Sequence, residues 1–280
     1  MSNEIQNFQQ EQSDWRKRRE ARLLKPMGWL EVIGLDWLKI GPNFAGSDSS
    51  CGIQLPDGSS QFLFRVDLKE SPSSIIEFLS DQKALMNGEA VKQGQKYELH
   101  FDGDGSGQGT VVNCQSLTMV FIKRDYGHGV RTYDSNSQAK AEFTGLDWFP
   151  ADPKFKIKAK WIPLEGTKKL MIPDVLGQMK EKTAVGCAVF QVDGFEQKLF
   201  ATMDDGLLFF IFKDLTHKNE TYGTGRFLYA TPAKEGAVTL DFNRAISPPC
   251  AFTPYATCPL PPAENVLKIA IPAGEKKPKS

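Results

Sequence analysis

Short apolar runs separated by turn residues constrain this chain more than any other feature of its sequence. From Trp29 to Tyr133 these runs are a few residues long, and Gly, Asn, Asp or Pro stands between them. Such a pattern is typical of antiparallel strands, because successive side chains of a strand point to opposite faces of its sheet. The sequence therefore predicts an all-β protein, built as an antiparallel sandwich or barrel. In this part the clearest strands are expected at residues 61–66, 75–79, 97–101 and 117–123.

A second series of strands begins after Phe149 and Pro150. Residues 155–162 alternate regularly, with three lysines between the apolar residues that should face the core. Further strands are expected at 184–192, 198–203, 207–212, 226–229, 238–242 and 266–271. These two series predict two packed β units, at residues 27–135 and 145–272, which are joined near residues 135–150.

The two ends of the chain differ from the rest. Residues 4–25 lack Gly and Pro and stop just before Pro26, so residues 1–26 are expected to hold an N-terminal helix. Its basic run, residues 16–19, suggests either a nucleic-acid arm or a solvated helix face, and the acidic residues nearby favour the solvated face. Residues 274–280 are expected to form a flexible, frayed tail.

Charge and composition limit the expected partners and location. The chain has 34 basic and 34 acidic residues, so no net field attracts nucleic acid or an anionic membrane. It has no apolar leader at its amino terminus and no run of 18 apolar residues. We therefore expect a soluble, cytoplasmic protein whose partner is a small molecule or another protein. The oligomeric state cannot be predicted from these features.

The cysteines indicate a reducing compartment. There are five, an odd number, and none forms the C-x-x-C pair that zinc sites use. Cys250 and Cys258 flank a Pro-rich segment, so a disulfide could close a nine-residue loop. Two reduced thiols are favoured over a disulfide or a reactive nucleophile, because no leader indicates secretion and no His or Lys stands next to either thiol.

Several motifs of the second half resemble a known family of proteins. They are Glu220–Gly223, Gly225–Leu228, Asp241–Ala245, Pro248–Pro254, Thr257–Pro262, Asn265 and Ala273–Lys276, with Gly28–Leu30, Gly34–Leu38 and Phe143–Leu146 before them. Together they resemble the domain of unknown function 1684 family over nearly the whole chain. This resemblance implies no activity and no catalytic residue.

Residues 41–134 also resemble a forkhead-associated β-sandwich. The matching motifs are Gly41–Asn43, Gly46–Asp48, Ile53–Pro56 and Met86–Gly88. That family binds phosphothreonine through an Arg in its first loop and a Ser and a His further on. This chain has no Arg at Gly46–Asp48 and no His after the serines of residues 58–64. The resemblance therefore implies the fold, whereas phosphopeptide binding is not expected.

Motifs for common catalytic and cofactor sites are missing from the sequence. It has no G-x-S-x-G elbow, no G-x-G-x-x-G and no P-loop, and its three histidines are scattered. No cofactor and no metal site is therefore expected. Asp102–Gly107 matches the first half of a calcium loop, but Asn113 stands where the bidentate Glu is needed, so a flexible hairpin is favoured.

The candidate ligand-binding residues are polar side chains at turns and strand ends of the second unit. They are Glu220, Tyr222, Arg226, Asp241 and Asn243. A Gly-x-Gly turn leads into Arg226, and an Arg near a Tyr and an Asn offers donors for a carboxylate or an amide. The alternative is an Arg–Asp pair and a Tyr hydroxyl that fasten the Pro-rich segment to the sheet.

These observations favour a small-molecule-binding protein with a polar site in the second unit. Two other classes stay open. One is an enzyme, a hydrolase or lyase without a familiar motif, and the other is a protein-interaction module that uses the first unit. A polar pocket near Arg226 would favour a binder or an enzyme, and an exposed apolar patch on residues 41–134 would favour a protein partner.

Overall fold

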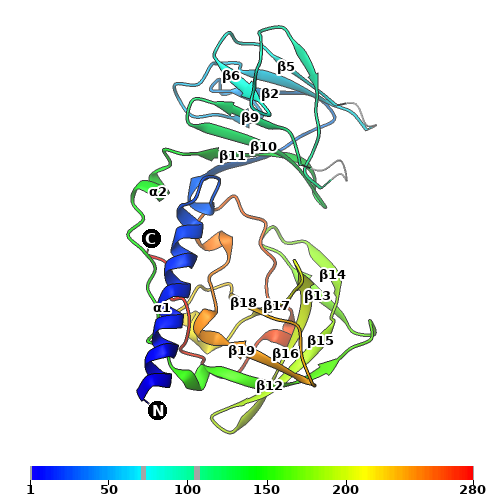
Figure 1. Ribbon diagram of the computed structural model, residues 1–280. Coiled ribbons are helices and arrows are strands. Elements are labelled where there is room, and N and C mark those ends of the chain that lie inside the picture. Colours follow the sequence, from blue (N-terminus) through cyan, green and yellow to red (C-terminus); the bar gives the residue numbers. More distant parts are fainter. Residues whose placement is uncertain (1, 71–73, 104–107, 280) are drawn as a thin grey trace. The chain divides into compact units, whose positions relative to one another are not determined.

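The computed structural model describes residues 2–70, 74–103 and 108–279, and the chain divides into two compact units (Figure 1). The first β unit is Leu24–Phe143. The second β unit joins Thr144–Ser280 to the N-terminal segment Met1–Leu23. The N-terminal helix thus belongs to the unit that is farther along the chain. Both units are mainly antiparallel β structure, so the predicted fold class is confirmed.

The first β unit is a sandwich of two sheets. One sheet has the order β3-β2-β4-β5-β8 and the other β1-β11-β10-β9-β6-β7. The strands are β1 (Val32–Trp37), β2 (Gly41–Gly46), β3 (Ile53–Gln54), β4 (Phe64–Leu68), β5 (Ile75–Phe78), β6 (Ala84–Met86), β7 (Glu89–Ala90), β8 (Lys96–Glu98), β9 (Val111–Cys114), β10 (Leu117–Arg124) and β11 (Gly127–Asp134).

Alternating burial explains why these strands pack face to face. In β4 the buried residues are Phe64, Val66 and Leu68, and the residues between them are only partly buried. In β10 the buried residues include Leu117, Met119 and Phe121. The rings of Phe64 and Phe121, from opposite sheets, lie 6.0 Å apart. One face of each sheet therefore buries the shared core, and a short helix, α2 (Gln138–Ala141), follows the sandwich.

The second β unit is built on one six-stranded sheet with the order β18-β17-β16-β15-β12-β19. Its strands are β12 (Lys156–Pro163), β15 (Gly186–Val192), β16 (Phe195–Asp204), β17 (Leu207–Phe212), β18 (Arg226–Ala230) and β19 (Ala237–Asp241). A separate hairpin is formed by β13 (Lys169–Pro173) and β14 (Met179–Thr183). Strand β12 alternates as expected, with Ala159 buried and Lys158 and Lys160 exposed on either side of it.

The sheet of the second β unit curls until its two edge strands, β18 and β19, lie side by side (Figure 1). The curl encloses a core of aromatic and aliphatic side chains, among them Phe190, Phe210, Phe212 and Phe242. Residues of the outer face, such as Phe209 and Tyr229, lie outside this enclosed core. Side chains of the outer face can therefore line cavities on the surface of this unit.

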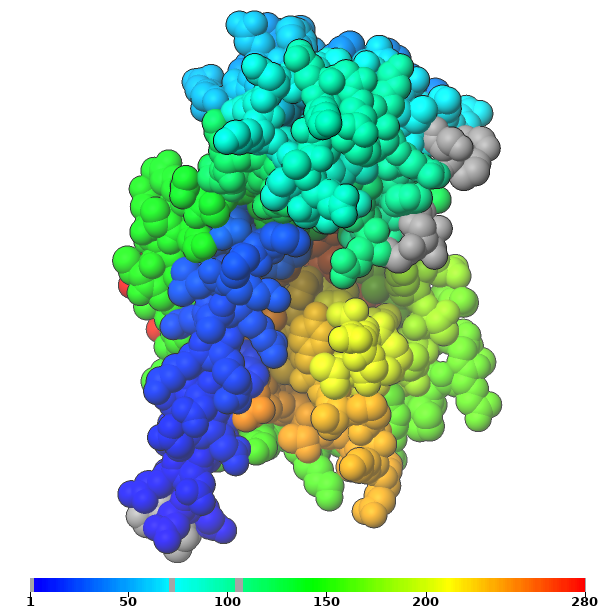
Figure 2. All heavy atoms as spheres, turned by 45° about the horizontal axis from the view of Figure 1, so that its top comes forward, coloured from blue at the N-terminus to red at the C-terminus, as the bar shows by residue number. Residues whose placement is uncertain are grey.

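Helix α1 (Ser2–Leu24) packs along the second β unit (Figure 2). The helix confirms the prediction made from residues 4–25. Its basic run is not a simple solvated face, because Arg16 donates to the Phe149 carbonyl and Arg19 pairs with buried Glu275. In the described part of the chain, no helix has the length and apolar character needed to cross a membrane.

The C-terminal part differs from the sequence-based expectation at two places. Residues 266–271 do not form a strand, because only an isolated bridge joins Val266 to Lys213, just after the end of β17. The segment expected to be a frayed tail, residues 274–280, holds the fully buried side chain of Glu275. The amides of Glu275, Lys276 and Lys277 donate to the carbonyls of Ala245, Asp147 and Glu220, so these contacts fix the backbone.

Candidate functional site

Arg226 is the first residue of β18 and points into the core. The Gly-x-Gly turn leads directly into the strand as expected, and the side chain of Arg226 is 1% exposed. Its guanidinium pairs with Asp214 at 3.0 Å and donates to the carbonyls of Ile271 and Ala273. Burial lowers the pKa of Arg226, and Asp214 opposes that effect most strongly. This residue holds the C-terminal segment against the sheet.

Tyr222 fastens the Pro-rich segment. Its hydroxyl donates to the Cys250 carbonyl at 2.6 Å. Burial raises the pKa of Tyr222 to about 12, so the hydroxyl keeps its proton near neutral pH. Glu220 contributes main-chain bonds nearby, since its carbonyl accepts from the Lys277 amide. Tyr222 therefore links two segments that lie 28 residues apart in the sequence.

Asp241 and Asn243 do lie together, at the end of β19. Asp241 Oδ1 accepts from both the backbone and the side-chain nitrogen of Asn243. Asn243 also exchanges two hydrogen bonds with the backbone of Asp152, while Asp241 Oδ2 accepts from Gln12 of α1 and pairs with Arg244 at 3.3 Å. These bonds tie β19 to the loop before β12 and to α1.

The five predicted site residues therefore separate into three groups. Arg226 lies in the core, Tyr222 and Glu220 hold neighbouring loops, and Asp241 and Asn243 close the end of β19. Their contacts favour the alternative interpretation, in which these side chains fasten segments to the sheet. Their predicted ligand-binding role stays a prediction. Asp241 alone among them lines one of the described cavities.

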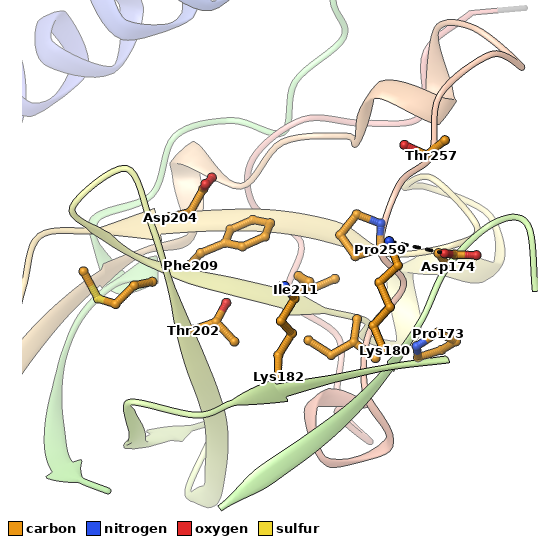
Figure 3. A pocket seen from close by; sticks show the side chains of 12 residues that line it. Pro173, Asp174, Lys180, Lys182, Thr202, Asp204, Phe209, Ile211, Thr257 and Pro259 are labelled. Carbon is orange, nitrogen blue, oxygen red and sulfur yellow. Dashed lines mark ion pairs between the residues drawn. The ribbon is translucent and has the colours of Figure 1, made fainter. Parts of the chain in front are cut away.

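A cavity of about 300 Å³ lies on the outer face of the sheet, under the β13–β14 hairpin (Figure 3). We call it the lysine cavity. Thr202 of β16 is the register partner of Phe209 of β17, so both side chains share this face. The lining residues are Ile172, Pro173, Asp174, Lys180, Lys182, Thr202, Met203, Asp204, Phe209, Ile211, Thr257 and Pro259.

The lysines of this cavity stand two residues apart on β14, which places both on one face of the strand. Figure 3 shows their side chains extending toward the strands that carry Thr202, Phe209 and Ile211. Lys180 lies 4.0 Å from buried Asp174, whose other oxygen accepts from two backbone amides. Lys182 has no hydrogen bond or ion pair with any residue that the structure describes. The charge of Lys182 thus lies beside apolar side chains and has no partner among the described residues.

A second cavity, of about 600 Å³, lies beside α1, and we call it the arginine cavity. Asp204 lines both cavities, and its carboxylate accepts from the Tyr229 hydroxyl at 3.1 Å. Burial is the main cause that raises the pKa of Tyr229, and the negative charge of Asp204 raises it further. The lining residues are Trp15, Arg19, Arg22, Lys156, Asp204, Asp205, Leu207, Tyr229, Ala230, Thr231, Thr239, Asp241, Arg244 and Ile246.

Charges in the arginine cavity largely neutralise one another. Arg19 pairs with Glu275 and Arg244 pairs with Asp241, so neither guanidinium is available without losing a partner. Arg22 and Asp205 have no partner among residues 2–70, 74–103 and 108–279, but their charges are opposite. The lysine cavity differs in that Lys182 has no hydrogen bond or ion pair with a described residue.

The described residues include no group of three or more His, Cys, Asp and Glu side chains that could hold a metal ion. The calcium-loop motif cannot be compared with this finding, because residues 104–107 lie outside the described part of the chain.

Sequence reasoning missed the lysine cavity. Its lysines lie in the polar segment 179–183, which reads as an exposed hairpin strand. The spacing of Lys180 and Lys182, two residues apart, places both side chains on one face of a strand. That spacing indicates a cavity only once the hairpin is known to fold over Phe209 and Ile211. Asp214, the buried partner of Arg226, gave no signal, because it stands in a loop between β17 and β18.

Comparison with known proteins gives a family but no activity. Residues 141–276 match the family described as "Protein of unknown function (DUF1684)". An uncharacterised protein of Haloarcula marismortui, solved by NMR, is 31% identical over 49% of this chain and 78% of its own, with a TM-score of 0.41. No curated protein matches this chain.

Two other similar structures are of segments of Rad53. The N-terminal FHA domain of S. cerevisiae Rad53p, in complex with a phosphothreonine peptide, is 15% identical over 40% of this chain and 77% of its own, with a TM-score of 0.21. Rad53 1–466 in complex with AMP-PNP is 13% identical over 73% of this chain and 48% of its own, with a TM-score of 0.23. This chain thus spans about half the length of that second Rad53 structure.

Proposed function

Because this chain belongs to the DUF1684 family, through residues 141–276, and that family has no described activity, we propose a function from the geometry of its cavities. We propose that the second β unit binds a small organic carboxylate with an apolar body in the lysine cavity. The observation that carries this proposal is an unpaired Lys182 beside an apolar wall that includes Phe209 and Ile211.

The lining of the cavity supports this ligand class. Ligand sites are mostly apolar and hold a few polar groups that orient the bound molecule. Phe209, Ile211 and Ile172 offer contacts to an aliphatic or aromatic body. Lys182 offers a positive charge to an acid group, and the hydroxyls of Thr202 and Thr257 offer further hydrogen bonds. A volume near 300 Å³ suits a compact molecule, at the lower end of the range for ligand pockets.

The test is a thermal-shift series with matched acids and amides. Benzoate, 3-phenylpropionate and hexanoate are compared with their uncharged amides, so that only the charge differs within a pair. A ligand at about 100 times its Kd stabilises the folded state by about 2.7 kcal/mol, which raises Tm by several degrees. We expect at least one acid to raise Tm and its amide to have a much smaller effect.

Variants assign that effect to the cavity. Lys182→Gln keeps a polar side chain, slightly shorter than lysine, and removes its charge, so it should abolish the difference between acid and amide. Lys158→Gln is the matched control, because Lys158 is an exposed lysine of β12 outside both cavities. The proposal fails if no acid raises Tm, or if Lys182→Gln responds like the parent protein.

We also propose that the protein is cytoplasmic and has no nucleic-acid partner. All five cysteines are free thiols, which suits a reducing compartment. Two cations of the basic run in α1, Arg16 and Arg19, are committed to contacts within the second β unit. Tight binding to DNA or RNA at moderate salt in a gel-shift series would contradict the proposal that the protein has no nucleic-acid partner.

A further inference from the structure

Two cysteines of the Pro-rich segment, Cys250 and Cys258, meet in the second β unit, although they are eight positions apart in the sequence. Cys250 lies in a single 3₁₀ turn (Pro249–Ala251), and its backbone amide donates to the Cys258 sulfur at 3.2 Å. Tyr222 holds the Cys250 carbonyl, and the Val175 amide donates to the Cys258 carbonyl at 3.1 Å. The fold therefore anchors both residues and keeps their side chains together.

The two thiols differ in exposure and in hydrogen bonding. The Cys258 side chain is buried, while Cys250 is partly exposed. The Thr224 hydroxyl lies 3.9 Å from the Cys250 sulfur. Hydrogen bonds, chiefly from the Cys258 thiol, lower the pKa of Cys250 to about 7. By contrast, burial raises the pKa of the thiols of Cys51, Cys114 and Cys187.

We propose that Cys250 and Cys258 form a peroxide-reactive thiol pair, in which Cys250 is the attacking thiol and Cys258 the resolving thiol. The Cys250 thiolate attacks one oxygen of hydrogen peroxide, the O–O bond breaks, and hydroxide leaves and takes up a proton. Cys250 is then a sulfenic acid. The Cys258 sulfur attacks it, the S–O bond breaks, water leaves and a disulfide forms.

The atoms and electrons of these steps balance. The two thiols lose two electrons and two protons in total, and hydrogen peroxide is reduced to two molecules of water. A dithiol reductant restores the pair by thiol–disulfide exchange. The thiolate is the nucleophile, and because the pKa of Cys250 is lowered to about 7, more of this thiol is ionised at neutral pH than of an ordinary thiol.

The site is separate from the lysine cavity but adjoins it. Thr257 and Pro259, the neighbours of Cys258 in the chain, both line that cavity. The thiol chemistry itself needs no ligand in the cavity, so it can be tested independently of the proposed carboxylate binding.

The experiment treats the full-length protein with a small excess of hydrogen peroxide at pH 7. We expect the number of free thiols to fall from five to three, with one disulfide between Cys250 and Cys258 in the peptide map. Cys258→Ser should stop the reaction at the sulfenic acid, which dimedone labels at Cys250. Cys250→Ser should abolish the fast reaction, and the rate in the parent protein should rise through pH 7.

Cys187→Ser is the matched control, because Cys187 is a buried thiol of β15 outside the pair, and it should leave the fast reaction unchanged. The proposal is overturned if another cysteine reacts first, or if Cys250 is oxidised in the parent protein without a disulfide to Cys258. Thermal denaturation of both serine variants shows whether they are folded. If a serine variant is unfolded, the peptide map of the peroxide-treated parent decides the result: a disulfide between Cys250 and Cys258 supports the proposal, and oxidation of any other cysteine first overturns it.

Discussion

The guanidinium of Arg226 and the carboxylate of Asp214 form an ion pair at 3.0 Å inside the second β unit, where each side chain is 1% exposed. Asp214 also accepts from the Ile271 amide and from the Thr216 hydroxyl. The pair thus joins the start of β18 to the loop after β17 and to the C-terminal segment. Such a buried pair is costly to break, because one charge would be left in the core without a partner.

Arg226→Ala should therefore destabilise the second β unit strongly. Removing one partner of a buried ion pair costs about 3–5 kcal/mol, a large part of the stability of a typical domain. Urea unfolding should show this loss. Arg18→Ala is the control, because Arg18 is exposed on α1, and its free energy of unfolding should stay within about 0.5 kcal/mol of the parent. A stable Arg226→Ala variant would contradict the fastening role and favour a ligand role.

Tyr222→Phe should have a smaller effect of the same sign. The substitution removes only the hydroxyl that donates to the Cys250 carbonyl, and one such bond contributes about 0.5–1.5 kcal/mol. Tyr255→Phe is the matched control, since Tyr255 is exposed and its hydroxyl has no partner among the described residues. Equal unfolding free energies for the two variants would show that the Tyr222 bond adds nothing measurable.

Asn265→Ala should destabilise the sheet where it joins β16 to β17. The buried amide of Asn265 donates to the carbonyls of Phe200 and Ile211 and accepts from the Phe200 amide. Alanine would leave these main-chain groups without partners, at about 1–3 kcal/mol for each group that water cannot reach. Hydrogen exchange at Phe200 and calorimetry measure the effect. Asn219→Ala, at an exposed asparagine, should leave both unchanged.

Asp36 should make the stability of the first β unit depend on pH. Burial raises the pKa of this β1 carboxyl to about 6, against an opposing backbone hydrogen bond from Gln54. The folded state then binds more protons than the unfolded state between about pH 4 and pH 6. The free energy of unfolding should fall as pH rises through this window and then level off.

The corresponding variant is Asp36→Asn. It should stabilise the protein at pH 7, where the parent buries a charge, and have little effect at pH 4. Calorimetry at both pH values measures the difference, and Asp57→Asn, in an exposed turn, is the control. A gain of the same size at both pH values would show that ionisation of Asp36 is not the cause.

The sequence determined the fold class because strand patterning is local. The run 207–212 needs no partner to be recognised as a strand, and the Gly-x-Gly turn before Arg226 directly predicts where β18 begins. The N-terminal helix follows likewise from the absence of Gly and Pro before Pro26. Such signals lie within a few residues of the element that they specify.

Only the tertiary structure decided which polar side chains meet. Residues 266–271 have a strand-like sequence, but they lie beside Lys213 through one bridge only, because extended pairing depends on a neighbour that the local pattern does not specify. Cys258 contacts Cys250, and Lys182 lies over the outer face of β17, through loops whose path no periodicity encodes. Distances between such groups depend on how the sheet curls, and for this reason the sequence suggested candidate residues while the fold set their partners.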